Sequence, residues 1–357
     1  MSNKTRVLII DDSAAVRMML STIINAEPDL TVVGVAADAL MAQEMIRHLR
    51  PDVLTLDVEM PKMDGLEFLQ RLMSLRPMPV VMVSTYTEAG TERAFKALEL
   101  GAVDVIGKLR ADGNRSDYAT ALTDKIRAAR HARLRFCNPF VSAPAKMPPP
   151  VAVGSAGRGG GRMIFIGAST GGTEALKEVL AAFPVDCPPT LIVQHMPETF
   201  TASFARRLDS LCPPRVVEAQ GNEALAAGTI YLAPGHSHLQ IRRGNGGCLT
   251  ELLKTDPVNR HRPSVDVLFD SAAAVAGSRA VGVILTGMGR DGAQGLLKMR
   301  QAGAATFGQD EASSTVYGMP QEAFRLGAVG QQCPLNEIAR RVLHAACGEA
   351  LPVKKKA

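Results

Sequence analysis

A glycine-rich turn near the middle of the chain constrains the fold most. The apolar run at residues 163–166 is followed by Gly-Ala-Ser-Thr-Gly-Gly at positions 167–172, and a helical pattern begins at Thr173. A strand that turns sharply through glycine into a helix presents Ser169 on an elbow ringed by backbone N–H groups. Such a serine can be a nucleophile. On this segment alone, an N-cap role for Ser169 or Thr170 is the simpler explanation.

Strand and helix patterns alternate along both halves of the chain. In the N-terminal part, strand patterns occupy residues 7–10, 31–35, 53–57, 80–83 and 103–106, with helical patterns beginning near Ala14, Ala39, Gly65 and Gly90 and after Ser116. In the C-terminal part, strand patterns occupy residues 163–167, 190–194, 229–233 and 280–286, with helical patterns at residues 173–183, 200–211, 265–276, 292–302 and 335–347. This alternation predicts two doubly wound α/β domains with mostly parallel sheets.

Composition divides the chain further. A proline-rich stretch followed by a glycine-rich one separates the two α/β parts, and neither can build a core. We therefore predict a first domain at residues 5–125, a helix end and linker at 126–161, a second domain at 162–349 and a basic tail at 350–357. The tail is most simply a solvated terminus.

Charge, hydropathy and cysteine usage exclude several classes of protein. The 357 residues carry a net charge of only +5, and no apolar run approaches the ~18 residues of a membrane span. The six cysteines show no Cys-x-x-Cys spacing, which favours reduced thiols and a cytoplasmic location. The second half also offers no helix-turn-helix or basic reading helix. We expect neither nucleic-acid binding nor membrane insertion.

Polar residues follow four strands of the first predicted sheet. Asp11 and Asp12 follow the first, Asp57 ends the third, Ser84 follows the fourth and Lys108 follows the fifth. Ligands collect beyond the carboxyl ends of parallel strands, so these groups are expected to meet. Each aspartate alone could be a cap or turn residue. Together the carboxylates suit Mg²⁺, and the lysine suits an incoming phosphoryl group.

This half resembles the receiver domains of two-component response regulators, which are flavodoxin-like. The resemblance implies that Asp57 is the phosphorylated aspartate, that Asp11 and Asp12 are the magnesium carboxylates, and that Glu59 supplies a backbone-carbonyl metal ligand. It also implies that Ser84 is the switch hydroxyl and that Lys108 is the phosphate-pairing lysine. Two positions depart from the receiver pattern: Leu109 replaces a usual proline, and Val105 replaces a frequent aromatic residue.

Reactive residue types also follow strands of the second predicted sheet. Ser169 follows the first of these strands, His195 the second and Asp291 the last. A nucleophile, a base and an orienting carboxylate are the parts of a catalytic triad. His236 and His238 are competing bases because they also follow a strand pattern, although in a turn-rich stretch. The order Ser, His, Asp disfavours the α/β-hydrolase fold, which runs Ser, acid, His.

The whole arrangement resembles the chemotaxis protein-glutamate methylesterases. The resemblance rests on five segments, at residues 167–172, 194–196, 233–235, 262–266 and 286–289. It implies hydrolysis of glutamate methyl esters on the cytoplasmic helices of chemoreceptors, deamidation of receptor glutamines, and activation through a chemotaxis histidine kinase.

The mechanism expected from these positions uses Ser169 as nucleophile, His195 as base and Asp291 as the orienting group. Backbone N–H groups around Thr170 and Gly171 and, by the family resemblance, Met288 would stabilise the oxyanion. This site needs no metal or organic cofactor, whereas the first domain needs Mg²⁺ for phosphorylation. The alternatives are a receiver-controlled receptor adaptor without catalysis and a DNA-binding output.

Overall fold

The computed structural model describes residues 4–61, 63–85, 87–109, 114–134 and 161–348. The chain divides into two compact units, residues 1–143 and 144–357. Most of the predicted linker and the predicted basic tail lie outside the described residues, so both remain predictions. No helix in the described ranges combines the length and apolar character needed to cross a membrane.

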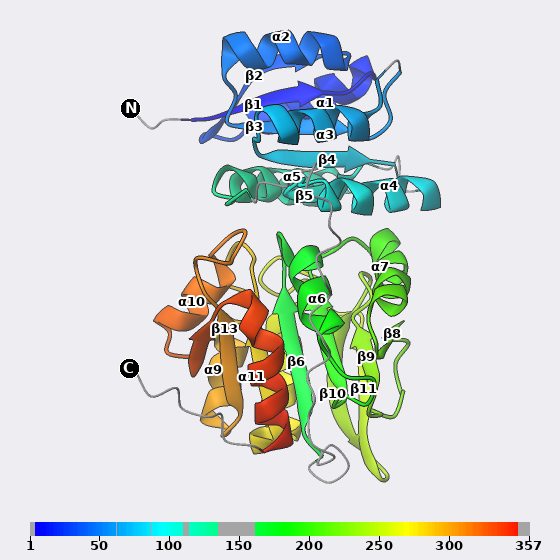
Figure 1. Cartoon of the computed structure of the whole chain (residues 1–357), viewed down its shortest axis with the longest axis vertical. Coiled ribbons are helices and arrows are strands. Elements are labelled where there is room, and N and C mark those ends of the chain that lie inside the picture. The colour runs from blue at the N-terminus through cyan, green and yellow to red at the C-terminus, as the bar shows by residue number, and fades with distance from the viewer. Residues whose placement is uncertain (1–3, 62, 86, 110–113, 135–160, 349–357) are drawn as a thin grey trace. The chain divides into compact units, whose positions relative to one another are not determined.

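The first unit is a five-stranded sheet that is parallel, as predicted, and its strand order is β2-β1-β3-β4-β5 (Figure 1). Its elements are β1 (Thr5–Ile10), α1 (Ala14–Asn25), β2 (Leu30–Ala36), α2 (Ala39–Leu49), β3 (Val53–Asp57), α3 (Gly65–Leu75), β4 (Val80–Ser84), α4 (Glu88–Glu99), β5 (Asp104–Gly107) and α5 (Arg115–Arg130). β3 and β4 are buried along their whole length, which explains why their residues are mostly apolar. The chain reverses its winding direction between β1 and β3, the usual place for a ligand in such a sheet.

The second unit contains a seven-stranded parallel sheet of order β14-β13-β12-β6-β7-β9-β8. Its strands are β6 (Met163–Ala168), β7 (Thr190–Gln194), β8 (Arg215–Glu218), β9 (Thr229–Leu232), β12 (Ala280–Ile284), β13 (Ala305–Gln309) and β14 (Gln331–Cys333). Its α-helices are α6 (Gly172–Ala181), α7 (Glu198–Leu211), α8 (Val265–Val275), α9 (Ala293–Gln301), α10 (Met319–Arg325) and α11 (Leu335–Cys347). The predicted fold class is therefore confirmed for both units.

Several elements of the second unit differ from the sequence prediction. β8, β13, β14 and α10 are additional, and β10 (His238–Gly244) pairs with β11 (Gly247–Leu253) in a separate antiparallel sheet. β8 and β14 have only four and three residues of mixed polarity, so they give little periodic signal, which is why they escaped prediction. The stretch after His236 was predicted to be rich in turns, yet His238 begins a strand.

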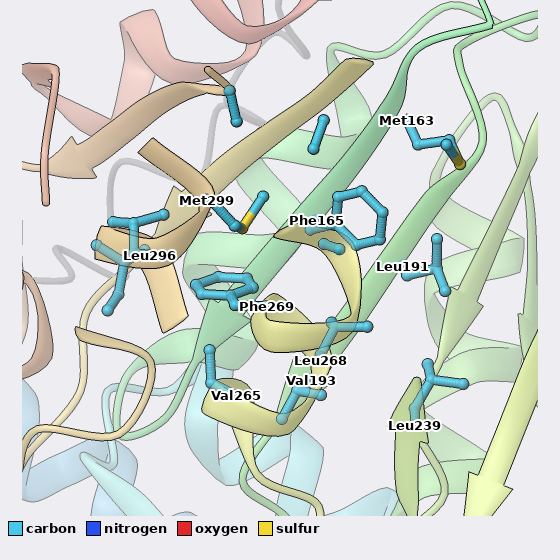
Figure 2. Packing of buried hydrophobic residues seen from close by; sticks show 14 of the residues in the cluster. Met163, Phe165, Leu191, Val193, Leu239, Val265, Leu268, Phe269, Leu296 and Met299 are labelled. Atoms are coloured by element: carbon cyan, nitrogen blue, oxygen red, sulfur yellow. The ribbon is translucent and has the colours of Figure 1, made fainter. Parts of the chain in front are cut away.

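Helix α8 packs at the centre of the second core. Figure 2 shows Val265, Leu268 and Phe269 of this helix among buried residues of β6, β7 and α9. The approach is close: a Cβ atom on Gly167 would lie 2.2 Å from Cγ1 of Val265. Glycine at position 167 therefore lets α8 begin directly beside the end of β6, where Ser169 follows.

Candidate active site

Ser169 lies on a tight turn between β6 and α6. Its backbone N–H donates to the Thr286 carbonyl at 3.0 Å, and its own carbonyl accepts from the Gly172 N–H at 2.7 Å. Gly171 has a φ of 76° and is the N-cap of α6, without a side-chain cap. The N-cap alternative for Ser169 and Thr170 is therefore wrong. Left-handed backbone at Gly171 allows the sharp turn that precedes the helix.

Strand pairing brings His195 beside Ser169. β6 and β7 are parallel neighbours whose last matched residues are Ala168 and Gln194, and Ser169 and His195 come next on each strand. The backbone N–H of His195 also donates to the Ala168 carbonyl at 3.1 Å. The buried Gln194 amide donates to the carbonyl oxygens of Ser169 and His195, at 3.0 and 3.3 Å. Sequence reasoning gave Gln194 no role, although it lies in the segment that carried the resemblance.

His195 and Asp291 form a buried pair. Nε2 of His195 lies 2.9 Å from Oδ2 of Asp291. Nδ1 of His195 is buried without a hydrogen-bond partner among the described residues. An ionised Asp291 only accepts hydrogen bonds, so the neutral imidazole carries its proton on Nε2. The lone pair then lies on Nδ1, which is the atom available to act as a base.

Asp291 is held by donors from α8 and from the loop before it. Oδ1 accepts from Ser264 Oγ at 2.7 Å and Asn259 Nδ2 at 2.8 Å, and Oδ2 accepts from the Val265 N–H at 2.6 Å. Burial raises the pKa of Asp291, but hydrogen bonds from His195, Asn259 and Ser264 outweigh burial and hold the pKa well below its usual range. The start of α8 also favours a negative charge here.

The loop before α8 contributes two residues that sequence reasoning missed. The His261 ring stacks on the His195 ring, with centroids 3.7 Å apart and planes 11° from parallel. Asn259 reaches Asp291 from the same loop. Ser264, by contrast, lay within a segment used for the resemblance and received no role. No local pattern reports these contacts, because each joins residues at least 27 positions apart.

The competing histidines have other partners. Nδ1 of His238 accepts from the Ser264 N–H at 3.0 Å, and Nε2 lies 3.0 Å from the Asp256 carbonyl. Both ring nitrogens of this fully buried histidine are therefore engaged with backbone. Nδ1 of His236 lies 2.7 Å from Oγ of Ser237. These contacts favour His195 over both alternatives as the base.

The expected oxyanion donors lie near the Ser169 turn. Thr170 and Gly171 follow Ser169 directly, and Met288 follows Gly287, where an added Cβ would lie 2.7 Å from Cβ of Ser169. The Gly287 N–H is engaged with the Val316 carbonyl at 3.0 Å. Their role in oxyanion binding stays a prediction.

In the first unit, Asp11, Asp12 and Asp57 form an acidic cluster. One carboxylate oxygen from each lies within 4.8 Å of the others. Lys108 Nζ lies 2.7 Å from Asp57 Oδ2 and 3.2 Å from Asp11 Oδ2. Burial raises the pKa of Asp57 to about 6, with Asp11 adding to the shift and Lys108 opposing it. Burial likewise raises the pKa of Asp11. Asp11 and Asp57 are buried and Asp12 is exposed, and crowded carboxylates of this kind are typical of a Mg²⁺ site.

The two remaining receiver residues lie beside this cluster. The Glu59 N–H donates to Asp57 Oδ1 at 3.2 Å, which places Glu59 next to the cluster. The Ser84 hydroxyl is buried and donates to the Gly90 carbonyl in the first turn of α4, at 2.9 Å. Val105 is buried within β5. Ser84 thus joins β4 to α4 at the edge that carries Asp57.

Comparisons with known proteins agree in both units. Residues 164–342 match the family model of the CheB methylesterase, and residues 7–114 match that of the response regulator receiver domain. The chain is 67% identical to protein-glutamate methylesterase/protein-glutamine glutaminase 1 of Dechloromonas aromatica, over 96% of this chain and 98% of that protein. It is 58% identical to a Nitrosomonas europaea protein-glutamate methylesterase/protein-glutamine glutaminase, over 95% and 96%.

A solved structure agrees with the fold of the second unit. The CheB methylesterase catalytic domain of Thermotoga maritima matches with a TM-score of 0.50 and 37% identity, covering 51% of this chain and 97% of that one.

Proposed function

The chain belongs to the CheB methylesterase family and carries a receiver domain, and from this we propose that Ser169, His195 and Asp291 perform its hydrolytic reaction. The protein is a protein-glutamate methylesterase/protein-glutamine glutaminase of chemotaxis adaptation. The observation that carries the site assignment is the strand register that sets Ser169 beside His195, combined with the 2.9 Å contact between His195 and Asp291.

In the proposed reaction, Ser169 Oγ attacks the ester carbonyl of a receptor glutamate. Nδ1 of His195 takes the serine proton and returns it to the methoxide, so that methanol leaves and an acyl-enzyme remains. Water then attacks the acyl group, again with His195 as base, which releases the glutamate carboxylate and restores Ser169. With a glutamine substrate the leaving group is ammonia. Asp291 orients the imidazole and stabilises its protonated form.

Backbone N–H groups near the serine turn would stabilise the oxyanion. Thr170, Gly171 and Met288 are the candidates, and removal of one such donor in an acyl-transfer enzyme costs ~3 kcal/mol of transition-state stabilisation. The backbone offers these donors without side-chain reorganisation, since Gly171 fixes the turn. The substrates are methylated chemoreceptor helices, as the family implies.

The receiver residues would control this activity. Asp57 is the proposed phospho-acceptor, with Asp11, Asp12, Asp57 and the Glu59 carbonyl as Mg²⁺ ligands. When bound, Mg²⁺ would neutralise charge on the phosphoryl oxygens. Lys108 already pairs with Asp57 and would pair with the phosphoryl group, while Ser84 would leave the Gly90 carbonyl to bond a phosphoryl oxygen. A chemotaxis histidine kinase would be the phosphodonor, and phosphorylation would raise esterase activity.

Methanol release from methylated receptors tests the proposal. Wild-type protein should release methanol, and faster with Mg²⁺ and a small-molecule phosphodonor; Asp57→Asn should retain only the basal rate. A serine-directed organophosphonate should label Ser169 and stop the release. A protein that binds receptors but neither reacts with the organophosphonate nor releases methanol would instead be a non-catalytic adaptor.

A further inference from the structure

A two-residue turn lies against the His195–Asp291 pair. Val258 and His261 exchange backbone hydrogen bonds of 3.0 and 2.9 Å across it. The residues between them, Asn259 and Arg260, have φ angles of 52° and 68°. Left-handed backbone at two consecutive non-glycine residues is unfavourable, although asparagine tolerates it better than most. The surrounding contacts therefore hold this turn in a conformation that the backbone alone does not favour.

The turn contacts both members of the catalytic pair. His261 stacks on the His195 ring, and Asn259 donates to the Asp291 carboxylate. Arg260 lies between them and is exposed. A single short loop thus reaches the base on one side and its orienting carboxylate on the other.

Asn259 bridges two buried carboxylates. Its Nδ2 donates to Asp291 Oδ1 at 2.8 Å and to Asp266 Oδ2 at 2.7 Å. Asp291 and Asp266 are 1% and 9% exposed, so water does little to separate their charges. One amide group with two protons satisfies one oxygen of each. The Ser264 hydroxyl also donates to Asp291 Oδ1, but of the two carboxylates it reaches Asp291 alone.

The second carboxylate matters because it is close to the first. Burial raises the pKa of Asp266, the Gly295 N–H lowers it, and the Asp291 charge raises it again. Asp270 adds a further negative charge near Asp266. Two like charges in a buried site repel each other, and hydrogen-bond donors between them offset that repulsion. Asn259 is the side chain that donates to both.

We propose that Asn259 is a positioning residue for the methylesterase reaction, holding the Asp291 carboxylate in the orientation that His195 requires and shielding it from Asp266. This rests on the proposed function of Ser169, His195 and Asp291. The donors on Oδ1 fix the plane of the carboxylate, which leaves Oδ2 directed at Nε2 of His195. If the Asp291 carboxylate rotated, or accepted the hydrogen bond from His195 Nε2 more weakly, the other imidazole tautomer would be favoured. In that tautomer Nδ1 carries the proton and cannot act as a base.

Asn259→Asp in the full-length protein provides the test, read as the pH profile of kcat for methanol release. When protonated, the new carboxyl can donate one hydrogen bond; when ionised, it adds a third negative charge beside two buried carboxylates. We expect kcat to fall at least tenfold relative to wild type at pH 8 and to recover partly near pH 5.5. Asn259→Ala should lower kcat about tenfold at both pH values, because it removes the donor and adds no charge.

The matched control is Asn222→Asp. Asn222 also has a left-handed backbone, with a φ of 65°, and its Oδ1 accepts from Arg242. It undergoes the same chemical change outside the catalytic residues, so its kcat profile should match wild type. A kcat profile of Asn259→Asp that parallels wild type would overturn the proposal.

A swapped pair separates positioning from folding. Asn259→Asp should lower thermal stability, because it adds a charge beside two buried carboxylates. Combined with Asp266→Asn, it restores one amide and one carboxylate with unchanged net charge, so the double variant should recover much of that stability. It still lacks the amide donor at position 259, so kcat at pH 8 should stay low. Recovery of kcat together with stability would reduce Asn259 to a folding role and overturn the proposal.

Two further measurements keep the outcome clear. If Asn259→Asp does not fold, Asn259→Ala carries the test through the downfield proton resonance of the His195 Nε2–H, which should shift or disappear. An unchanged resonance with unchanged kcat would overturn the proposal.

Failure of the proposed function has a different signature. Ser169→Ala would then keep its activity, whereas failure of the Asn259 proposal alone leaves activity dependent on Ser169.

Discussion

Two aspartates cross-link the starts of two helices: Asp291, just before α9, accepts a hydrogen bond from the start of α8, and Asp266, in α8, accepts one from the start of α9. Asp291, two residues before α9, accepts the Val265 N–H at the start of α8 at 2.6 Å. Asp266, the second residue of α8, accepts the Gly295 N–H in the first turn of α9 at 2.7 Å. The proposed catalytic carboxylate, Asp291, is therefore also a capping group between two helices. This double role lets stability and activity be tested together.

Asp291→Asn should separate charge from shape at this position. We expect kcat to fall ~10³- to 10⁴-fold near neutral pH, since the amide no longer fixes the imidazole tautomer. Stability should fall as well, because the native carboxylate has a depressed pKa and its contribution is present above about pH 4 and lost as pH falls through the native value. Urea unfolding at pH 7 and pH 3 measures this: the difference between wild type and variant should shrink at pH 3. An equal difference at both values would contradict it.

Ser169→Ala and His195→Ala should each lower methanol release by orders of magnitude. Because the three residues act as one unit, the double variant should be little worse than the poorer single one. Phosphorylation of Asp57, which lies in the other unit, should be unchanged in all of them. Near-normal release by Ser169→Ala would refute the nucleophile, and survival of His195→Ala alone would move the base to His236 or His238.

Gly172→Ala should damage the serine turn through Gln194. An added Cβ would lie 2.1 Å from Gln194 Oε1 and 2.8 Å from Cβ of Ala168. Displacing Gln194 would disturb its hydrogen bonds to the Ser169 and His195 carbonyls, so kcat should fall and unfolding free energy should drop by ~1–3 kcal/mol. The matched control is Gly247→Ala, where a Cβ meets nothing within 4 Å. Equal stability loss in both variants would point to a general glycine effect instead.

The metal-free receiver should lose stability as pH rises from about 4 to about 6. The folded pKa of Asp57 is raised from 3.8 to about 6, so the folded state binds the proton more tightly, and this contribution is lost as pH rises through the folded value. At ~1.4 kcal/mol per pKa unit, the change is on the order of 3 kcal/mol. Urea unfolding with a chelator should show this loss in wild type, and Asp57→Asn should show a smaller loss, to which the raised pKa of Asp11 still contributes.

Above pH 6, Mg²⁺ should restore the stability that the receiver has lost. The cation offsets repulsion among Asp11, Asp12 and Asp57, so binding should weaken below about pH 6, where Asp57 takes up a proton. Titration of Mg²⁺ at pH 5 and pH 7.5, followed by thermal unfolding, measures the effect. A stabilisation that does not change between the two pH values would contradict a site built on Asp57.

Local pattern determined the elements that matter for both sites. The ranges of β3, β7 and α11 agree residue for residue with their periodic patterns, and Ser169, His195 and Asp291 were found as polar groups after strands. This works because a buried parallel strand has an unbroken apolar run, and in such sheets functional groups gather beyond the strand's carboxyl end. The acidic cluster was predictable for the same reason: its three aspartates follow two adjacent strands.

Tertiary structure decided which nitrogen of His195 contacts Asp291, and which residues hold that pair. The stacking of His261 and the hydrogen bonds from Asn259 and Ser264 depend on how α8 and its preceding loop dock beside β6 and β12. Such contacts join residues distant in sequence and carry no period of their own, because packing and hydrogen-bond satisfaction in a crowded interior select them. The sequence alone located the three candidate catalytic groups, and only the tertiary structure set their orientation.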